Sequence, residues 1–172
     1  NVYGRSKLVG EEMVREANSR HMVLRTAWVY SPFGRNFVKT MMAAAETRDC
    51  LTVVDDQMGN PSSALDLAEG LLRAVEAWRG TPGAGLGETY HLAGSGIVSW
   101  CGFAQAIMDE CRSRGLPSAE VRSIRTEDLP TKAARPPNSA LDSSKFARHF
   151  GFRMPCWRES LAVVMAGIAV RR

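Results

Sequence analysis

Tyr3 and Lys7 are the residues whose types and spacing most clearly suggest chemistry. Residues four apart on a helix are stacked neighbours, so the phenol and the ammonium can face one cleft. A free phenol titrates near ~10, and a cation ~4 Å away at an effective dielectric of ~20 favours its ionised form by about 4 kcal/mol. This pair could exchange a proton with a carbinol or carbonyl oxygen. The alternative is an ordinary helix start, in which Lys7 pairs with Glu11 in solvent.

Three further residues are candidate ligand contacts. Trp28 lies toward the carboxyl end of a predicted strand, where ligands of open α/β sheets bind; its ring could stack on a sugar or pack in the core. Asn36 begins a predicted helix, which suits an anion but is equally compatible with a plain helix start. Arg135 lies in a Pro-rich loop, and a guanidinium binds phosphate bidentately, although a surface Arg in such a loop is usually solvated.

Two glycine clusters could be mistaken for a phosphate-binding loop. Gly83-x-Gly85-x-Gly87 precedes a predicted strand, whereas a dinucleotide loop leaves a strand and opens a helix. Gly94-Ser95-Gly96 stands between a strand and a helix, but Ser99 occupies the third glycine position. We interpret the first cluster as a connector and the second as a tight turn, so the 172 residues contain no dinucleotide-binding fingerprint.

The composition is typical of a globular protein, with 45% hydrophobic and 23% charged residues and a net charge of +4. Lys and Arg are scattered, which argues against nucleic-acid binding. The four cysteines form no C-x-x-C pair and are typical of reduced thiols in a cytoplasmic protein. The longest apolar stretch, 161–170, is too short to cross a bilayer, and no signal peptide is visible, so we expect no membrane partner.

Hydrophobic periodicity and capping residues predict alternating helices and strands. Helices are expected at 3–18, 36–46, 63–78, 99–114, 143–150 and 155–169, and strands at 22–30, 51–54, 88–93 and 121–125. Ser62 or Ser63 can cap the third helix, and Ser99 the fourth. The strand at 22–30 is almost continuously apolar, as in a parallel sheet covered on both faces. Polar loops are expected at 55–61 and 126–138. This pattern predicts an α/β layer fold.

Six runs of residues, in order along nearly the whole chain, resemble one family. They are Asn1–Glu11, Leu24–Tyr30, Asn36–Met41, Asp56–Pro61, Tyr90–Gly94 and Ala134–Ser139. The family is dTDP-4-dehydrorhamnose reductase, an extended short-chain dehydrogenase/reductase, and the resemblance is to its carboxyl-terminal part. It implies a partial Rossmann-like parallel sheet with helices and a small α/β substrate-binding region. Residues 1–172 would form that portion, with the amino-terminal half of the fold missing.

The resemblance also implies a reaction and its participants. The family reduces the 4-keto group of dTDP-4-dehydro-L-rhamnose with NADPH or NADH, giving dTDP-L-rhamnose for bacterial surface polysaccharide. Tyr3 would donate the proton, and Lys7 would tune Tyr3 and hold the nicotinamide ribose. Trp28 would contact the sugar, and Asn36 and Arg135 would hold the diphosphate. Gln57 lies in a matching run and is assigned no role.

Some expectations stay open. The family is described as using Mg²⁺, yet no acidic pair here can be assigned as its ligands. A homodimer is compatible with the resemblance, although the sequence does not give the oligomeric state. Without a glycine-rich turn, we expect the isolated chain to be inactive. The alternatives are another nucleotide-sugar epimerase or dehydratase, or a non-catalytic regulatory subunit of the same fold.

Overall fold

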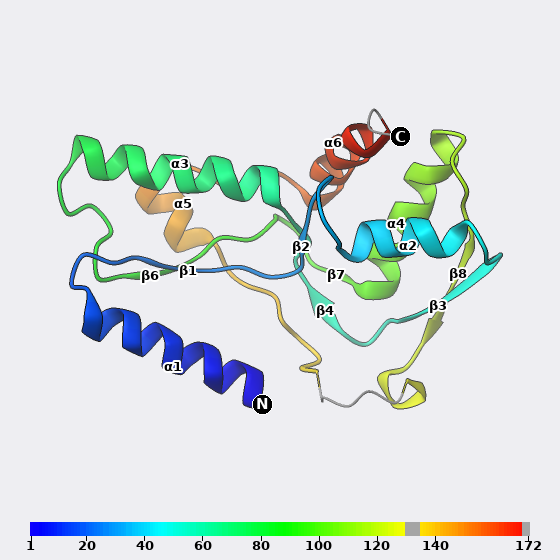
Figure 1. Ribbon diagram of the computed structural model, residues 1–172, viewed down its shortest axis with the longest axis horizontal. Coiled ribbons are helices and arrows are strands. Elements are labelled where there is room, and N and C mark those ends of the chain that lie inside the picture. Colours follow the sequence, from blue (N-terminus) through cyan, green and yellow to red (C-terminus); the bar gives the residue numbers. More distant parts are fainter. Residues whose placement is uncertain (130–134, 170–172) are drawn as a thin grey trace.

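The structure is a computed structural model that describes residues 1–129 and 135–169, arranged as two lobes joined by a narrower centre (Figure 1). The first lobe contains α1 (Val2–Ala17), β1 (Val23–Arg25), α3 (Ala64–Gly80), β6 (Thr89–His91) and α5 (Ser144–Phe150). The second contains α2 (Phe37–Ala45), β3 (Cys50–Val54), α4 (Trp100–Ser113), β8 (Glu120–Ile124), η1 (Thr126–Asp128) and α6 (Trp157–Ala169). The centre contains β2 (Val29–Tyr30), β4 (Met58–Gly59), β5 (Ser62–Ser63) and β7 (Val98–Ser99).

The described strands form four two-stranded sheets. The pairs β1–β6, β2–β5 and β3–β8 are parallel, and β4–β7 is antiparallel. The prediction of an α/β fold with parallel strands is therefore confirmed. Within the described ranges, however, these pairs do not join into one continuous sheet.

The prediction of one continuous strand at 22–30 is wrong. It is divided into β1 and β2, which pair with different partners, β6 and β5. The break falls at Trp28, whose φ of 48° lies in the left-handed region. Between β1 and β2 the chain passes from the first lobe to the centre (Figure 1). Tryptophan is not a turn residue, so nothing in the apolar pattern indicated the break.

In the first lobe, the β1–β6 pair lies between α1 on one face and α3 and α5 on the other. Side chains alternate between the two faces of a strand. Tyr90 and Leu92 are therefore buried together with Phe146 of α5 and Ala74 of α3. Thr89 faces the other way and contacts α1.

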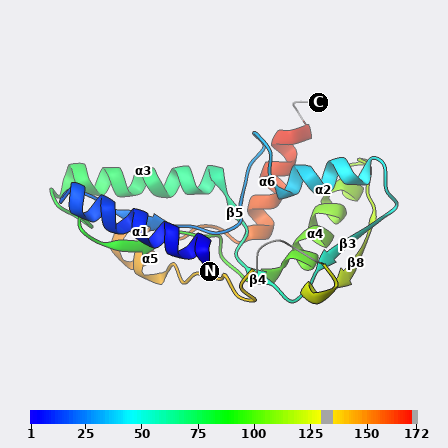
Figure 2. The ribbon, with the colours of Figure 1, turned by 60° about the horizontal axis from the view of Figure 1, so that its bottom comes forward.

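The second lobe contains the larger apolar core. Its helices α2, α4 and α6 pack around side chains that are almost fully buried, including Phe103, Ile107, Val164 and Met165. The β3–β8 pair covers one side of α4 (Figure 2), with Leu51 buried in the same cluster. This core fixes the positions at which α2 and α4 begin.

The helices predicted from sequence are all present, with ends within a few residues of the expected ones. Ser63 caps α3 and Ser99 caps α4, each accepting a hydrogen bond from a backbone N–H. The loop predicted at 126–138 contains 130–134, which lie outside the described residues; its described part includes η1. No helix in the described part of the chain is both long and apolar enough to span a membrane.

Candidate active site on the first helix and the central junction

Tyr3 and Lys7 lie in the first two turns of α1, on one side of the helix. The Lys7 Nζ is 5.4 Å from the centroid of the Tyr3 ring, and Tyr3 is 70% exposed. Asn1 begins the helix, because its Oδ1 accepts a hydrogen bond of 2.7 Å from the Gly4 N–H. The amino-terminal end of α1 points toward the centre of the molecule (Figures 1 and 2).

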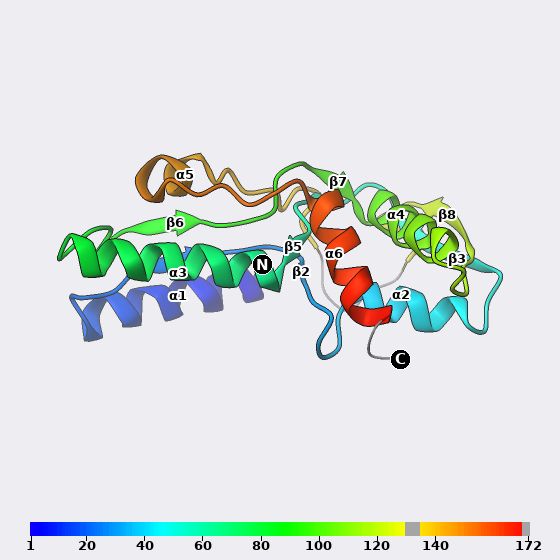
Figure 3. The same ribbon diagram turned by 90° about the horizontal axis from the view of Figure 1, so that it is seen from above.

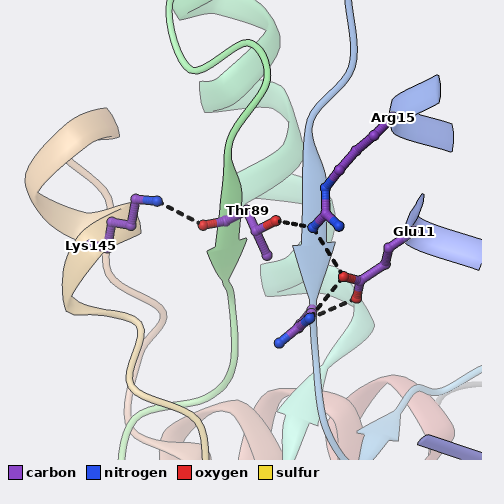
Figure 4. A network of polar contacts seen from close by, with 5 residues as sticks. Glu11, Arg15, Thr89 and Lys145 are labelled. Atoms are coloured by element: carbon purple, nitrogen blue, oxygen red, sulfur yellow. Dashed lines mark hydrogen bonds and ion pairs between the residues drawn. The ribbon is translucent and has the colours of Figure 1, made fainter. Parts of the chain in front are cut away.

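Ion pairs attach α1 to the β1–β6 pair (Figure 4). Glu11 accepts two hydrogen bonds from the guanidinium of Arg25 on β1, at 2.7 and 2.8 Å. Arg15 contacts Glu11 at 3.3 Å and donates to the Thr89 hydroxyl on β6 at 2.8 Å. Lys145 of α5 donates to the Thr89 carbonyl from the other side. The network thus fixes the helix that carries Tyr3 and Lys7 to two strands at once.

The same contacts argue against the alternative in which Glu11 pairs with Lys7 in solvent. The Glu11 side chain is only 14% exposed and is held by Arg25 and Arg15. The hydrogen bonds from Arg25 lower the pKa of the Glu11 carboxyl below its ordinary value, so that Glu11 is ionised at neutral pH. Glu11 is therefore a structural anchor of α1, and the ammonium of Lys7 lies beside the Tyr3 ring instead.

Trp28 lies in the turn between β1 and β2, at the centre of the molecule. Its ring stacks on Trp100 at the start of α4, with centroids 3.6 Å apart and planes 9° apart. Its Nε1–H donates to the Ser139 hydroxyl at 2.9 Å. The ring is partly buried and packs against the core of the second lobe. Part of the Trp28 side chain therefore packs in the core, which was the alternative to a sugar contact.

Asn36 is the N-cap of α2. Its Oδ1 accepts a hydrogen bond from the Lys39 N–H, and its amide group donates to the carbonyl oxygens of Ser31 and Phe33. These contacts match a plain helix start. A substrate contact of Asn36 stays a prediction.

Arg135 is exposed, four residues before Ser139. The segment that follows it pairs with β4, because Met58 N–H donates to the Pro137 carbonyl and Ser139 N–H donates to the Met58 carbonyl, both at 2.8 Å. The chain is therefore tethered to β4 from two residues after Arg135. The role of Arg135 toward phosphate stays a prediction.

Sequence reasoning missed the part played by the run 56–60. Asp56 accepts hydrogen bonds from both the N–H and the hydroxyl of Thr126, which lower the pKa of its carboxyl. Gln57 is 7% exposed and donates to the same Thr126 hydroxyl at 3.0 Å.

Asn60, 4% exposed, donates to the carbonyl oxygens of Gly94 and Gly96 and accepts from the Leu141 N–H. This short run holds both described ends of the Arg135 loop, one at Thr126 and the other at 137–141. In the sequence, the only indication of this role was that the run is polar and lies in a predicted loop. That pattern does not identify hydrogen-bond partners as distant in sequence as Thr126 and Leu141.

Several helices begin at the same centre. Within the described ranges, α2, α3 and α4 have their amino-terminal ends toward this centre, while the start of α1 lies apart from them, below it in Figure 1 (Figures 1 and 3). Helix amino-termini carry partial positive charge and free N–H groups, which favour anions. The starts of α2, α3 and α4 therefore bring partial positive charge to the centre, and at each of them a capping side chain already accepts a hydrogen bond from a backbone N–H.

The residues present fit a nicotinamide cofactor in part and a metal ion poorly. Tyr3 and Lys7 are both exposed, and a phenol and an ammonium are groups that form hydrogen bonds with ribose hydroxyls. Among the described residues, no group of three or more His, Cys, Asp or Glu could hold a metal ion. No step of the reaction is therefore assigned to Mg²⁺.

Fold and site together define an α/β protein whose first helix carries Tyr3 and Lys7 near its start and points toward the central junction. Its sequence is 44% identical over 163 residues to the dTDP-4-dehydrorhamnose reductase of Sinorhizobium fredii and 39% identical over 161 residues to that of Escherichia coli K12. These alignments cover 93% and 92% of the chain. The family model described as RmlD substrate binding domain matches residues 1–170. The chain therefore belongs to the dTDP-4-dehydrorhamnose reductase (RmlD) family.

A solved structure agrees with this assignment. The dTDP-4-dehydrorhamnose reductase of Bacillus anthracis, crystallised in complex with NADP, matches 96% of the chain with a TM-score of 0.84 at 33% identity. The chain spans about half the length of the relatives it matches: 54% and 53% of the two curated sequences and 55% of the crystallised chain. The family predicted from sequence is confirmed.

Proposed function

We propose that this chain supplies the Tyr–Lys helix and the sugar-nucleotide site for reduction of dTDP-4-dehydro-L-rhamnose to dTDP-L-rhamnose. The observation that carries the proposal is the placement of α1. Tyr3 and Lys7 share one side of a helix whose end points to the centre, and the helix is fixed to two strands by Glu11 and Arg15. Identities of 44% and 39% to named reductases support the substrate class.

The roles of the residues follow from their chemistry. NADPH or NADH, when bound, supplies a hydride to the keto carbon. The Tyr3 phenol donates its proton to the keto oxygen, so the C=O bond becomes CH–OH. The ammonium of Lys7 stabilises the phenolate left on Tyr3 until solvent returns the proton. Lys7 also holds the nicotinamide ribose.

Substrate binding uses the central junction. Trp28 presents its ring to the sugar beside the stack on Trp100. Arg135 and the start of α2 at Asn36 supply positive potential for the diphosphate. Each of these contacts is part of the proposal.

A chimera gives the test. The aligned part of this chain, 93% of its length, would replace the region of the S. fredii reductase that it matches at 44% identity. We expect the chimera to oxidise NADPH only when dTDP-4-dehydro-L-rhamnose is added. A chimera that folds and binds the sugar nucleotide without turnover would favour the regulatory alternative. Turnover of a different nucleotide sugar, with none of this one, would favour an epimerase or dehydratase.

A further inference from the structure

Trp28 is strained at its backbone. Among the described residues it is the one non-glycine with positive φ, at 48°. The left-handed conformation is unfavourable for a residue with a Cβ, and bulky residues rarely adopt it. Such strain persists where the surroundings hold it, and it concentrates at functional sites.

Three contacts hold the Trp28 ring. One face stacks on Trp100, with centroids 3.6 Å apart. Gly59 of β4 lies against the indole so closely that a Cβ there would stand 2.3 Å from Trp28 Cε2, so only glycine leaves room for the ring. The third contact is the hydrogen bond from Nε1–H to the Ser139 hydroxyl.

Ser139 connects this ring to the segment that carries Arg135. Its hydroxyl accepts from Trp28 and donates to the Met58 carbonyl at 3.0 Å, while its own N–H donates to the same carbonyl at 2.8 Å. One side chain therefore joins the turn after β1, the β4 backbone and the segment 137–139. The hydroxyl uses both its donor and an acceptor position, which alanine cannot reproduce.

We propose that Ser139 is a positioning residue that presents Trp28 and Arg135 together to one nucleotide sugar. The proposal rests on the proposed function, since it assumes that Trp28 contacts the sugar and Arg135 the diphosphate. Ser139 acts through both residues and need not touch the ligand. Loss of its hydroxyl frees the indole N–H and loosens the register of the 137–139 segment on β4.

The first measurement follows the hydrogen bond itself in the 172-residue chain without ligand. NMR of the indole N–H groups is recorded for the wild type, Ser139→Ala and Ser139→Thr. We expect Ser139→Ala to shift the Trp28 Nε1–H resonance and speed its exchange with solvent, and Ser139→Thr to keep both. Ser113→Ala is the control, because that hydroxyl also donates to a backbone carbonyl but lies at the end of α4. An unmoved Trp28 resonance in Ser139→Ala overturns the proposal.

The second measurement is calorimetric binding of dTDP-L-rhamnose to the same proteins. We expect Ser139→Ala to bind about fivefold more weakly, the loss expected for one net hydrogen bond, and both Ser139→Thr and Ser113→Ala to bind as the wild type does. A shifted resonance with unchanged affinity shows a purely structural contact and contradicts the positioning role. No binding by the wild-type chain overturns the ligand part of this inference, whereas turnover of the chimera tests the proposed function and the indole resonance still decides the contact.

Discussion

The second lobe and α1 are held in place by opposite means. In the second lobe, side chains such as Phe103 and Val164 are fully buried among α2, α4 and α6. In α1 no residue is buried, and Glu11 and Arg15 make its contacts with the strands by charge. The scaffold should therefore respond to changes of volume, and the helix that carries Tyr3 and Lys7 to changes of charge.

The largest effect is expected from Phe103→Ala in the scaffold. Phe103 is 0% exposed, and its ring contacts the rings of Tyr30, Phe37 and Trp157. Truncation should lower the free energy of unfolding by about 3–5 kcal/mol, measured by denaturant titration with circular dichroism. The control Val163→Ala, at a side chain that is 61% exposed, should change it by less than ~0.5 kcal/mol. Similar values for the two variants would contradict the assigned core.

Gly59→Ala should have the next largest effect, because it tests the junction between the two regions. The added methyl would collide with the Trp28 indole, and overpacking of this kind typically costs about 1–3 kcal/mol. Gly10→Ala, where nothing lies within 4 Å of the added Cβ, is the control in the same unfolding experiment. The contradicting result would be a Gly59→Ala protein with the same stability and the same tryptophan fluorescence as the wild type. It would show that Gly59 and the Trp28 ring pack less tightly than described.

Glu11→Gln should loosen α1 while leaving the second lobe intact. Because Arg25 is 43% exposed, water replaces part of the lost interaction, and we expect a local cost of about 1–2 kcal/mol. Hydrogen exchange should show faster exchange of α1 amides and unchanged protection in α4. The control is Glu12→Gln, whose side chain is exposed on the same helix. Equal protection of α1 in both variants would argue that apolar contacts hold the helix after all.

Lowering the pH should weaken the attachment of α1 no more than Glu11→Gln does, because it acts by protonating the same Glu11 carboxylate. The folded-state pKa of Glu11 is lowered by Arg25, so its contribution is complete above the ordinary value of 4.5 and is lost as pH falls through the lower folded value. Hydrogen exchange of α1, corrected for intrinsic rates, should therefore rise in the wild type as pH falls below the ordinary value of 4.5, and rise less in Glu11→Gln. A pH response of equal size in the two proteins would exclude Glu11 as the group responsible.

Much of the fold could be predicted from sequence because its signals are local. The apolar stripe of α3 and the caps Ser63 and Ser99 indicate helices without knowledge of any partner. The break at Trp28 could not be predicted, since it depends on Gly59 and Trp100, which are far away in sequence. Strands of two residues, such as β4 and β5, are likewise too short to have a periodicity.

In the candidate site, too, some features could be predicted from the sequence and others could not. The spacing of Tyr3 and Lys7 placed them on one side of a helix, and the structure agrees. The anchors Glu11, Gln57 and Asn60 act through contacts with Arg25, Thr126 and Leu141, and no spacing rule relates these partners. The family resemblance includes the runs that contain these anchors, but only the structure shows which residues they contact.

Single-turnover reduction of dTDP-4-dehydro-L-rhamnose by the chimera and its Tyr3→Phe variant tests the central claim most directly. The variant keeps the ring beside Lys7 and lacks only the hydroxyl. We predict that hydride transfer slows about 10²–10⁴-fold, the range for loss of a general acid, while affinity for dTDP-L-rhamnose is retained. An unchanged rate would contradict the assignment of Tyr3 as the proton donor.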